Sequence, residues 1–228
     1  MIGTARLTLT NLLVAINLIV FVWELATGGP DVDHGWLYGP AVSSGEWWRI
    51  FTGAFLHGSW AHVGLNMFAL FQVGNIVELL YGRVRYALLY VLSIIGSGAA
   101  VLAFSYNLPT LGASGAIFGL FGALVAVGLR MGSRGRGLIG QVLPIIVINL
   151  VFTFAVPGIS AAAHVGGLIT GFVVGLVLFM VPSRERQAVY AFAHDPRSDA
   201  EAVETIEQPP HAGPHEEAGD PVLRDPRE

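Results

Sequence analysis

The sequence predicts an all-α, polytopic membrane protein with six transmembrane helices and a long first outer loop. Three observations predict this class. The chain is 54% hydrophobic and only 12% charged, whereas soluble domains carry about 25% charged residues. Apolar runs near the length that a bilayer requires, about 20 residues, recur six times along the chain. The charged side chains fall mainly between these runs.

The six expected spans follow one another with short connections, apart from the loop after the first. Their ends are set to within a few residues, because helix ends fray. The first span follows Arg6, as in a signal peptide, but Glu24 and the absence of a small-residue cleavage site favour an uncleaved anchor. The spans are, in order, 9–26, 60–80, 86–106, 114–131, 138–156 and 160–181.

The arginines predict the orientation, because cytoplasmic loops are enriched in basic residues. One side of the six spans receives only Arg49, in a loop that also carries acidic residues. The segments 28–59, 107–112 and 157–158 are therefore expected outside the cell, with both termini in the cytoplasm and the protein in the cell membrane. The arginines of the opposite side are Arg6, Arg83, Arg85, Arg130, Arg134, Arg136, Arg184 and Arg186.

The composition divides the chain into two parts. Residues 1–182 are expected to form the membrane domain. Residues 183–228 are acidic, proline-containing and poor in large apolar side chains, which predicts a disordered cytoplasmic tail. The first outer loop is rich in tryptophan, tyrosine and phenylalanine, and such side chains favour the lipid headgroup region.

Several functions find no support in the composition. The chain has no cysteine, which excludes disulfides, thiolate metal sites and cysteine nucleophiles. Every basic residue is an arginine, and no basic stripe predicts nucleic-acid binding. His57 and His62 do not have the spacing of a metalloprotease motif. No cofactor or metal is implied.

Four polar residues from three spans are expected at one depth. Polar side chains inside spans are costly and usually mark function. His62 and Asn66 lie in the outer part of the second span, Ser114 at the outer end of the fourth, and His164 about one turn below the outer end of the sixth. Topology alone therefore predicts a polar cluster near the outer face. The other polar residues inside spans are Gln72, Asn75, Glu78, Gln141 and Asn149.

Local geometry makes this cluster chemically specific. His62 and Asn66 are four residues apart and face one way on a helix. Ser114 begins a helix, where free N–H groups favour a developing anion. Gly112 and Gly115 allow a sharp turn and a close approach of a second chain.

Small residues predict that the fourth and sixth spans pack closely together. Such faces let two helices approach backbone to backbone in lipid, which would place Ser114 within reach of His164. A serine beside a histidine is a nucleophile–base pair, and Phe118, four residues after the serine, could stack on the imidazole. The small residues are Gly115, Gly119 and Gly122 on one span and Gly167, Gly171 and Gly175 on the other.

Each of these residues also has a plainer interpretation. Ser114 could be a helix cap, and His62 could lie at the membrane interface. His164 could be a core histidine bonded to a carbonyl, and His57 has no further support beyond a structural role. Glu78 could pair with Arg83 or Arg85 at the inner interface.

The sequence resembles the rhomboid intramembrane serine proteases over residues 8–181. The resemblance rests on Trp48-Arg49 in the first loop, on Glu78, and on three short motifs that occur in order on the expected spans. These motifs are "HVGLN" with His62 and Asn66, "GASG" with Ser114, and "AHVGGLITG" with His164.

The resemblance implies a function and roles for these residues. Ser114 would be the nucleophile, His164 the base, and the side chains of His62 and Asn66 the oxyanion hole. Arg49 and Glu78 would be structural. The expected partners are transmembrane protein substrates in the lipid bilayer, cut near their outer ends. Spans two and five would form the side entrance, with Phe152 and Phe154 as gate residues.

Two other classes of function remain as alternatives. One is a catalytically inactive rhomboid-like protein that binds membrane clients; such proteins usually lack the serine or the histidine, whereas this chain keeps both. The other is a small transporter or channel, which would show inverted repeats or broken helices near the midplane. Neither feature is found in the sequence.

Overall fold

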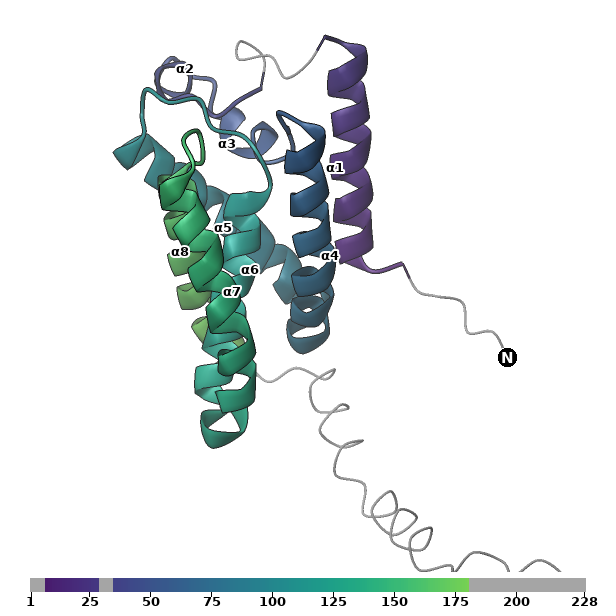
Figure 1. The fold of residues 1–228 in the computed structure, drawn as a ribbon, viewed down its shortest axis with the longest axis vertical. Coiled ribbons are helices and arrows are strands. Elements are labelled where there is room, and N and C mark those ends of the chain that lie inside the picture. Colours follow the sequence, from purple (N-terminus) through teal and green to yellow (C-terminus); the bar gives the residue numbers. More distant parts are fainter. Residues whose placement is uncertain (1–6, 29–34, 181–228) are drawn as a thin grey trace, which may run out of the picture. The chain divides into compact units, whose positions relative to one another are not determined.

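The computed structural model describes residues 7–28 and 35–180, which all belong to one unit, Met1–Gln187. The predicted tail, 183–228, lies outside the described residues. The helices are, in chain order, α1 (Leu9–Ala26), α2 (Gly39–Ser43), α3 (Arg49–Thr52), α4 (Trp60–Tyr81), α5 (Arg83–Phe104), α6 (Ser114–Arg130), the 3₁₀ turn η1 (Gly132–Gly135), α7 (Arg136–Ala155) and α8 (Ala161–Met180) (Figure 1).

The predicted class, an all-α polytopic membrane protein, is confirmed. The described residues form no strand, and all six predicted spans are helices. Within residues 7–28 and 35–180, five helices are long and apolar enough to cross a membrane: α1, α4, α5, the segment Gly132–Ala155 that contains α7, and α8. α6 is an apolar helix of 17 residues, about 25 Å long at about 1.5 Å per residue.

The long helices run alternately up and down in Figure 1, so α1 ends at the same end of the bundle at which α4, α6 and α8 begin. We call this the Ser114 end. The loop with α2 and α3 also lies there. Polar side chains set several helix starts, because Thr8, Ser59 and Ser160 each accept a hydrogen bond from a backbone N–H three residues later. Gly82, with φ of 77°, joins α4 directly to α5.

α6 lies at the centre of the bundle and packs against α4, α5, α7 and α8. Of its 17 residues, only Ser114, Val125, Leu129 and Arg130 are not buried. A helix surrounded by other helices need not present a full-length apolar face to lipid. Its central position explains how the shortest of the six predicted spans can lie within the bundle.

The contact between α6 and α8 is made by backbone against backbone. A Cβ atom added to Gly167 would collide with the carbonyl oxygen of Gly115, and one added to Gly171 would collide with the carbonyl oxygen of Gly119. Only glycine fits at these positions while the two helices keep this separation. The small faces on spans four and six therefore meet each other.

Glu78 on α4 holds the start of α1. Its carboxylate accepts hydrogen bonds from the N–H groups of Leu9 and Thr10, at 2.9 and 2.8 Å, and from the Thr10 hydroxyl at 2.8 Å. Arg83 is more distant, with 3.6 Å between Nε and the carboxylate, and it donates to the carbonyl of Leu7. The arginine pairing is thus secondary, because the free N–H groups of a helix start are the nearer donors.

The first loop is tied down at two points. Leu37 and Thr110 exchange two backbone hydrogen bonds, of 3.0 and 2.9 Å, which join the loop to the segment before α6. Arg49 is buried, forms an ion pair with Glu46 and donates to the carbonyl of Trp36. The arginine holds the loop together from inside, as a structural residue would.

His57 is fully buried where this loop enters α4. Its backbone N–H donates to the carboxylate of Glu24 on α1 at 3.0 Å, and its Nδ1 lies 3.1 Å from the carbonyl oxygen of Phe55. Its ring meets the ring of His62 edge to face, with 5.0 Å between centroids. Burial, assisted by the neighbouring His62, lowers the pKa of His57 to about 4.

We expect the substitution Gly171→Ala to separate α6 from α8 and to destabilise the bundle by about 1–3 kcal/mol, as overpacking does. Gly140→Ala on α7 is the matched control, because an added Cβ meets nothing within 4 Å there. Thermal unfolding in mild detergent, followed by circular dichroism, measures both. A Gly171→Ala protein as stable as the wild type would contradict the close contact.

We expect His57 to make the stability of the fold depend on pH. Since its pKa is lowered to about 4, against about 6.5 in an unfolded chain, neutral His57 favours the folded state. This contribution is complete above pH 6.5 and is lost as the pH falls toward 4. The melting temperature of His57→Gln should therefore fall less than that of the wild type between pH 7 and pH 4.5. Equal falls would show that His57 does not titrate in this window.

Candidate active site

Ser114 is the first residue of α6, reached through a segment that only glycine can form. Gly112 has a φ of 113°, and its N–H donates to the carbonyl of Gly53 at 2.8 Å. The N-cap of α6 is Ala113, and no side chain caps the helix. The interpretation of Ser114 as a helix cap is therefore wrong, and its hydroxyl is available for another partner.

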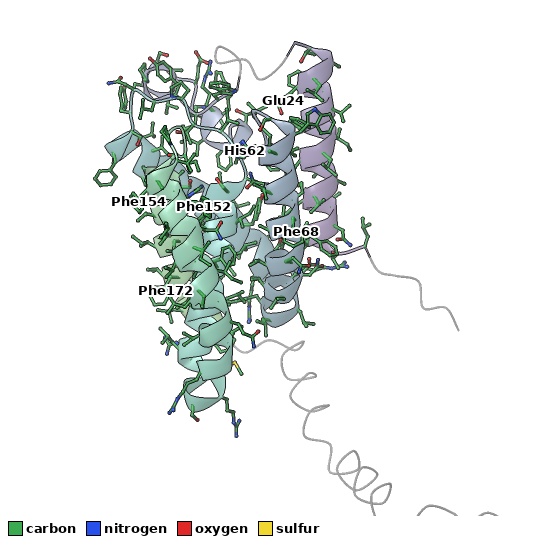
Figure 2. All side chains as sticks on the ribbon, in the orientation of Figure 1. Glu24, His62, Phe68, Phe152, Phe154 and Phe172 are labelled. Atoms are coloured by element: carbon green, nitrogen blue, oxygen red, sulfur yellow. The ribbon has the colours of Figure 1, made fainter. Side chains whose placement is uncertain are left out.

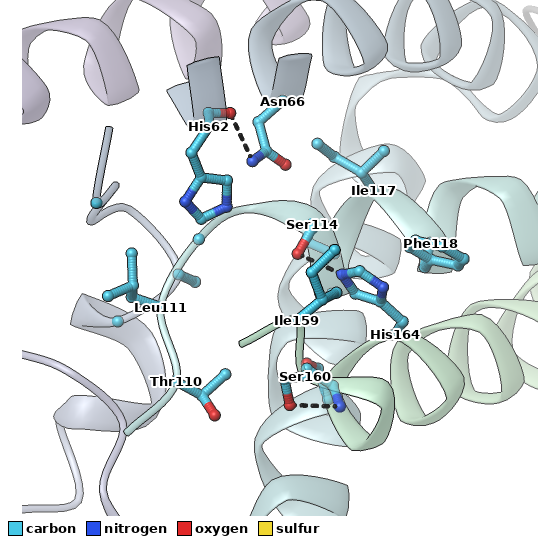
Figure 3. A pocket seen from close by; sticks show the side chains of 18 of the residues that line it. His62, Asn66, Thr110, Leu111, Ser114, Ile117, Phe118, Ile159, Ser160 and His164 are labelled. Atoms are coloured by element: carbon cyan, nitrogen blue, oxygen red, sulfur yellow. Dashed lines mark hydrogen bonds between the residues drawn. The ribbon is translucent and has the colours of Figure 1, made fainter. Parts of the chain in front are cut away.

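That partner is His164, on the first turn of α8. The Ser114 hydroxyl oxygen lies 2.8 Å from His164 Nε2, across 50 positions of sequence (Figure 3). The imidazole is 8% exposed. The ring of Phe118 stacks on it, with 4.2 Å between centroids and an interplanar angle of 16°. Packing on one face and a hydrogen bond at one edge thus orient the histidine.

The other ring nitrogen of His164 meets Thr153 of α7, which sequence analysis did not single out. The Thr153 hydroxyl lies 2.7 Å from His164 Nδ1 and 2.7 Å from the carbonyl oxygen of Asn149. A threonine is too common in apolar helices to attract notice. The available signal was its position, one helical turn after Asn149, which sequence analysis had noted as polar.

His62 and Asn66 lie on the first two turns of α4, facing the segment that leads into Ser114 (Figure 3). The Asn66 amide donates one N–H to the carbonyl of His62 at 3.0 Å, and a primary amide has a second N–H to offer. A Cβ added to Gly112 would lie 2.7 Å from His62 Nε2 and 3.9 Å from Asn66 Nδ2. The His62 ring therefore lies against Gly112 where a side chain would otherwise be, and Asn66 Nδ2 lies close by.

These groups line one cavity of about 740 Å³ at the Ser114 end. Its wall combines the first loop, the segment 109–112, the turn before α8 and the facing sides of α4 and α7. Most of the lining is apolar. The polar side chains of the wall include His62, Asn66, Ser114, Asn149, Ser160 and His164.

The remaining predicted residues lie elsewhere. Arg49 and Glu78 do not line the cavity, since they hold the first loop and the start of α1. Phe152 and Phe154, expected at the side entrance, lie along α7 with 60% and 70% of their surface exposed and are not part of the cavity wall (Figure 2). α7 presents Asn149 to the cavity instead.

The arrangement brings together a hydroxyl, an imidazole and two further nitrogen groups in a largely apolar hollow. Hydrogen-bond contact between a hydroxyl and an imidazole is what removal of the hydroxyl proton requires. The described residues contain no group of three or more histidine, aspartate or glutamate side chains placed to hold a metal ion. The chemistry that the contact of this hydroxyl with this imidazole offers is nucleophilic and acid–base.

Several known proteins are similar to this chain in sequence. Rhomboid protease GluP of Bacillus subtilis is 40% identical over 171 residues, which are 72% of this chain and 34% of that protein. Rhomboid-like protease 1 of Toxoplasma gondii is 30% identical over 188 residues, 75% of this chain and 64% of that protein. RHOMBOID-like protein 4 of Arabidopsis thaliana is 33% identical over 158 residues, 68% of this chain and 38% of that protein.

The match therefore spans about a third to two thirds of the length of these relatives. A family model described as "Rhomboid domain" matches residues 44–181. This range contains Ser114, His164, His62 and Asn66, together with every helix from α3 to α8. The chain belongs to the rhomboid family.

Proposed function

We propose that this chain is an intramembrane serine endopeptidase that hydrolyses peptide bonds of transmembrane proteins. One observation carries the proposal: Ser114 Oγ and His164 Nε2 are 2.8 Å apart inside a cavity of a membrane bundle. The protease names of two related proteins support it. A catalytically inactive client-binding protein would not need this contact.

In the proposed mechanism Ser114 attacks the carbonyl carbon of the substrate while His164 Nε2 takes the hydroxyl proton. The tetrahedral intermediate collapses to an acyl-enzyme as His164 gives that proton to the leaving amine. A water molecule then attacks the ester, His164 takes its proton, and the proton returns to Ser114 Oγ as the acid product leaves. A serine and a histidine suffice for this reaction, because Phe118 and Thr153 orient the His164 ring, as a carboxylate does in a catalytic triad.

The negative oxygen of each tetrahedral intermediate needs donors. We assign this role to the side chains of His62 and Asn66 and to the free N–H groups of the first turn of α6. The side-chain nitrogens of His62 and Asn66 lie beside Gly112, two residues before Ser114. The positive end of the α6 dipole favours negative charge at the same point.

The proposed location is the cell membrane, with both termini in the cytoplasm and the cavity open to the outer side. Support comes from the arginines, since those at the end of α6 and at the starts of α5 and α7 lie at the end of the bundle opposite Ser114. A site near the outer face would cut substrates close to the outer ends of their spans. The resemblance to rhomboid proteases also implies small residues at the cut.

The first test is cleavage in liposomes of a tagged single-span substrate with small residues near its outer end. We expect a product from the wild type and none from Ser114→Ala or His164→Ala. Both variants should remain folded, because neither substitution touches the glycine contact. No product from the wild type with several substrates would overturn the proposal, as would cleavage by Ser114→Ala at the wild-type rate.

The second test concerns the oxyanion. We expect Asn66→Ala to lower kcat by about 10²-fold, since removing one oxyanion donor typically costs this much. Asn75→Ala is the matched control on the same helix, because Asn75 lies away from the cavity and accepts from Thr8. Equal kcat values for the two variants would assign Asn66 to packing.

A further inference from the structure

Thr153 is an unusual residue on its helix. Of the residues of α7, only Val142, Ile146 and Thr153 are buried, so Thr153 is the one polar side chain that this helix buries. It is 3% exposed and its hydroxyl touches His164 Nδ1 at 2.7 Å. A buried hydroxyl at this place contacts the base of the proposed reaction directly.

The contacts around Thr153 are all satisfied by one arrangement of protons. The Thr153 hydroxyl has a single proton, and the carbonyl oxygen of Asn149 can only accept it. His164 Nδ1 must then donate to Thr153 Oγ, which leaves Nε2 of a neutral imidazole as an acceptor for the Ser114 hydroxyl. Three short contacts become three hydrogen bonds.

The opposite arrangement satisfies fewer contacts. If Thr153 donated its proton to His164 Nδ1, the hydroxyl would have no proton left for a hydrogen bond to the Asn149 carbonyl. The imidazole proton would then be on Nε2. His164 would then donate to Ser114 Oγ and could not accept its proton. A hydrogen bond made by one ring nitrogen sets the role of the other, so the Asn149 carbonyl and the Thr153 hydroxyl select the tautomer that a base requires.

We propose that Thr153 is a positioning residue that holds His164 as the Nδ1–H tautomer, with Nε2 free to accept the proton of Ser114. This inference rests on the proposed function. Thr153 acts through His164 and does not touch the substrate. It also places part of the catalytic arrangement on a third helix: Ser114 belongs to α6, His164 to α8, and the group that selects the tautomer to α7.

The tautomer can be measured without activity. Nitrogen-15 spectra of protein labelled at histidine distinguish protonated from unprotonated ring nitrogens, and the His164 signals are those missing from His164→Gln. We expect Nδ1–H in the wild type and in Thr153→Ser, and mainly Nε2–H in Thr153→Val, which has the same shape without the hydroxyl. Nε2–H in the wild type, or Nδ1–H retained in Thr153→Val, would overturn the proposal.

Kinetics supply the second readout. Thr153→Val should lower kcat by about tenfold or more, within the range that general base catalysis contributes, and should leave KM nearly unchanged. Thr153→Ser should restore most of kcat. Thr170→Val on α8, whose hydroxyl lies by Gly96 of α5, should behave as the wild type. Unchanged kcat in Thr153→Val, or an equal loss in Thr153→Ser, would contradict a role for the hydroxyl.

The two proposals can fail separately. If no substrate is cleaved by the wild type while His164 shows the predicted tautomer shift, the protease function fails and the positioning role of Thr153 stands. If the wild type cleaves substrate and the tautomer and kcat do not respond to Thr153→Val, the protease function stands and the positioning role fails.

Discussion

The backbone contact between α6 and α8 is the constraint on which the candidate site depends. Ser114 and His164 lie on different helices, and a hydrogen bond between their side chains tolerates an error of only a few tenths of an ångström. At glycine pairs such as Gly119 and Gly171 the backbones of the two helices are already in contact, so the distance between the helix axes cannot become smaller. Because both side chains project from the first turns of these helices, this separation sets the distance between them.

Around this contact, buried polar groups anchor the pieces that cannot be held by apolar packing. Lipid tails are as apolar as leucine, so apolar packing alone drives helix association weakly in a membrane. Glu78 binds the start of α1, Glu24 binds the backbone at His57, and buried Arg49 holds the first loop. The carboxylates of Glu78 and Glu24 accept hydrogen bonds from backbone N–H groups, and that of Glu46 pairs with Arg49. These contacts fix the bundle at both of its ends.

Much of this architecture could be predicted from the sequence. Hydropathy predicted the six helices to within three residues at each end, because a run of about 20 apolar residues is typical of a membrane-spanning helix. The meeting of Ser114 with His164, and the stacking of Phe118, followed from topology and helical spacing. These features are encoded locally, in runs and in intervals of four residues.

The features that escaped prediction depend on contacts between distant segments. Glu78 was expected to pair with Arg83 or Arg85, and Arg83 does lie 3.6 Å from its carboxylate. The shorter hydrogen bonds from N–H groups almost 70 positions away could not be foreseen. The contact of Thr153 with His164 requires the mutual rotation of α7 and α8, which no interval along the chain reveals. Phe152 and Phe154 were expected as gate residues at the side entrance; they lie exposed on α7, outside the cavity wall, and the gate role stays a prediction.

The central claim is that Ser114 is chemically activated by His164 within the folded bundle, and this can be tested without knowing a substrate. The measurement is reaction with a fluorophosphonate probe in mild detergent, followed by peptide mapping. We predict a single adduct on Ser114 in the wild type and none in His164→Ala or in unfolded protein. Equal labelling of Ser114 in His164→Ala, or an adduct on another serine with Ser114 untouched, would contradict the account.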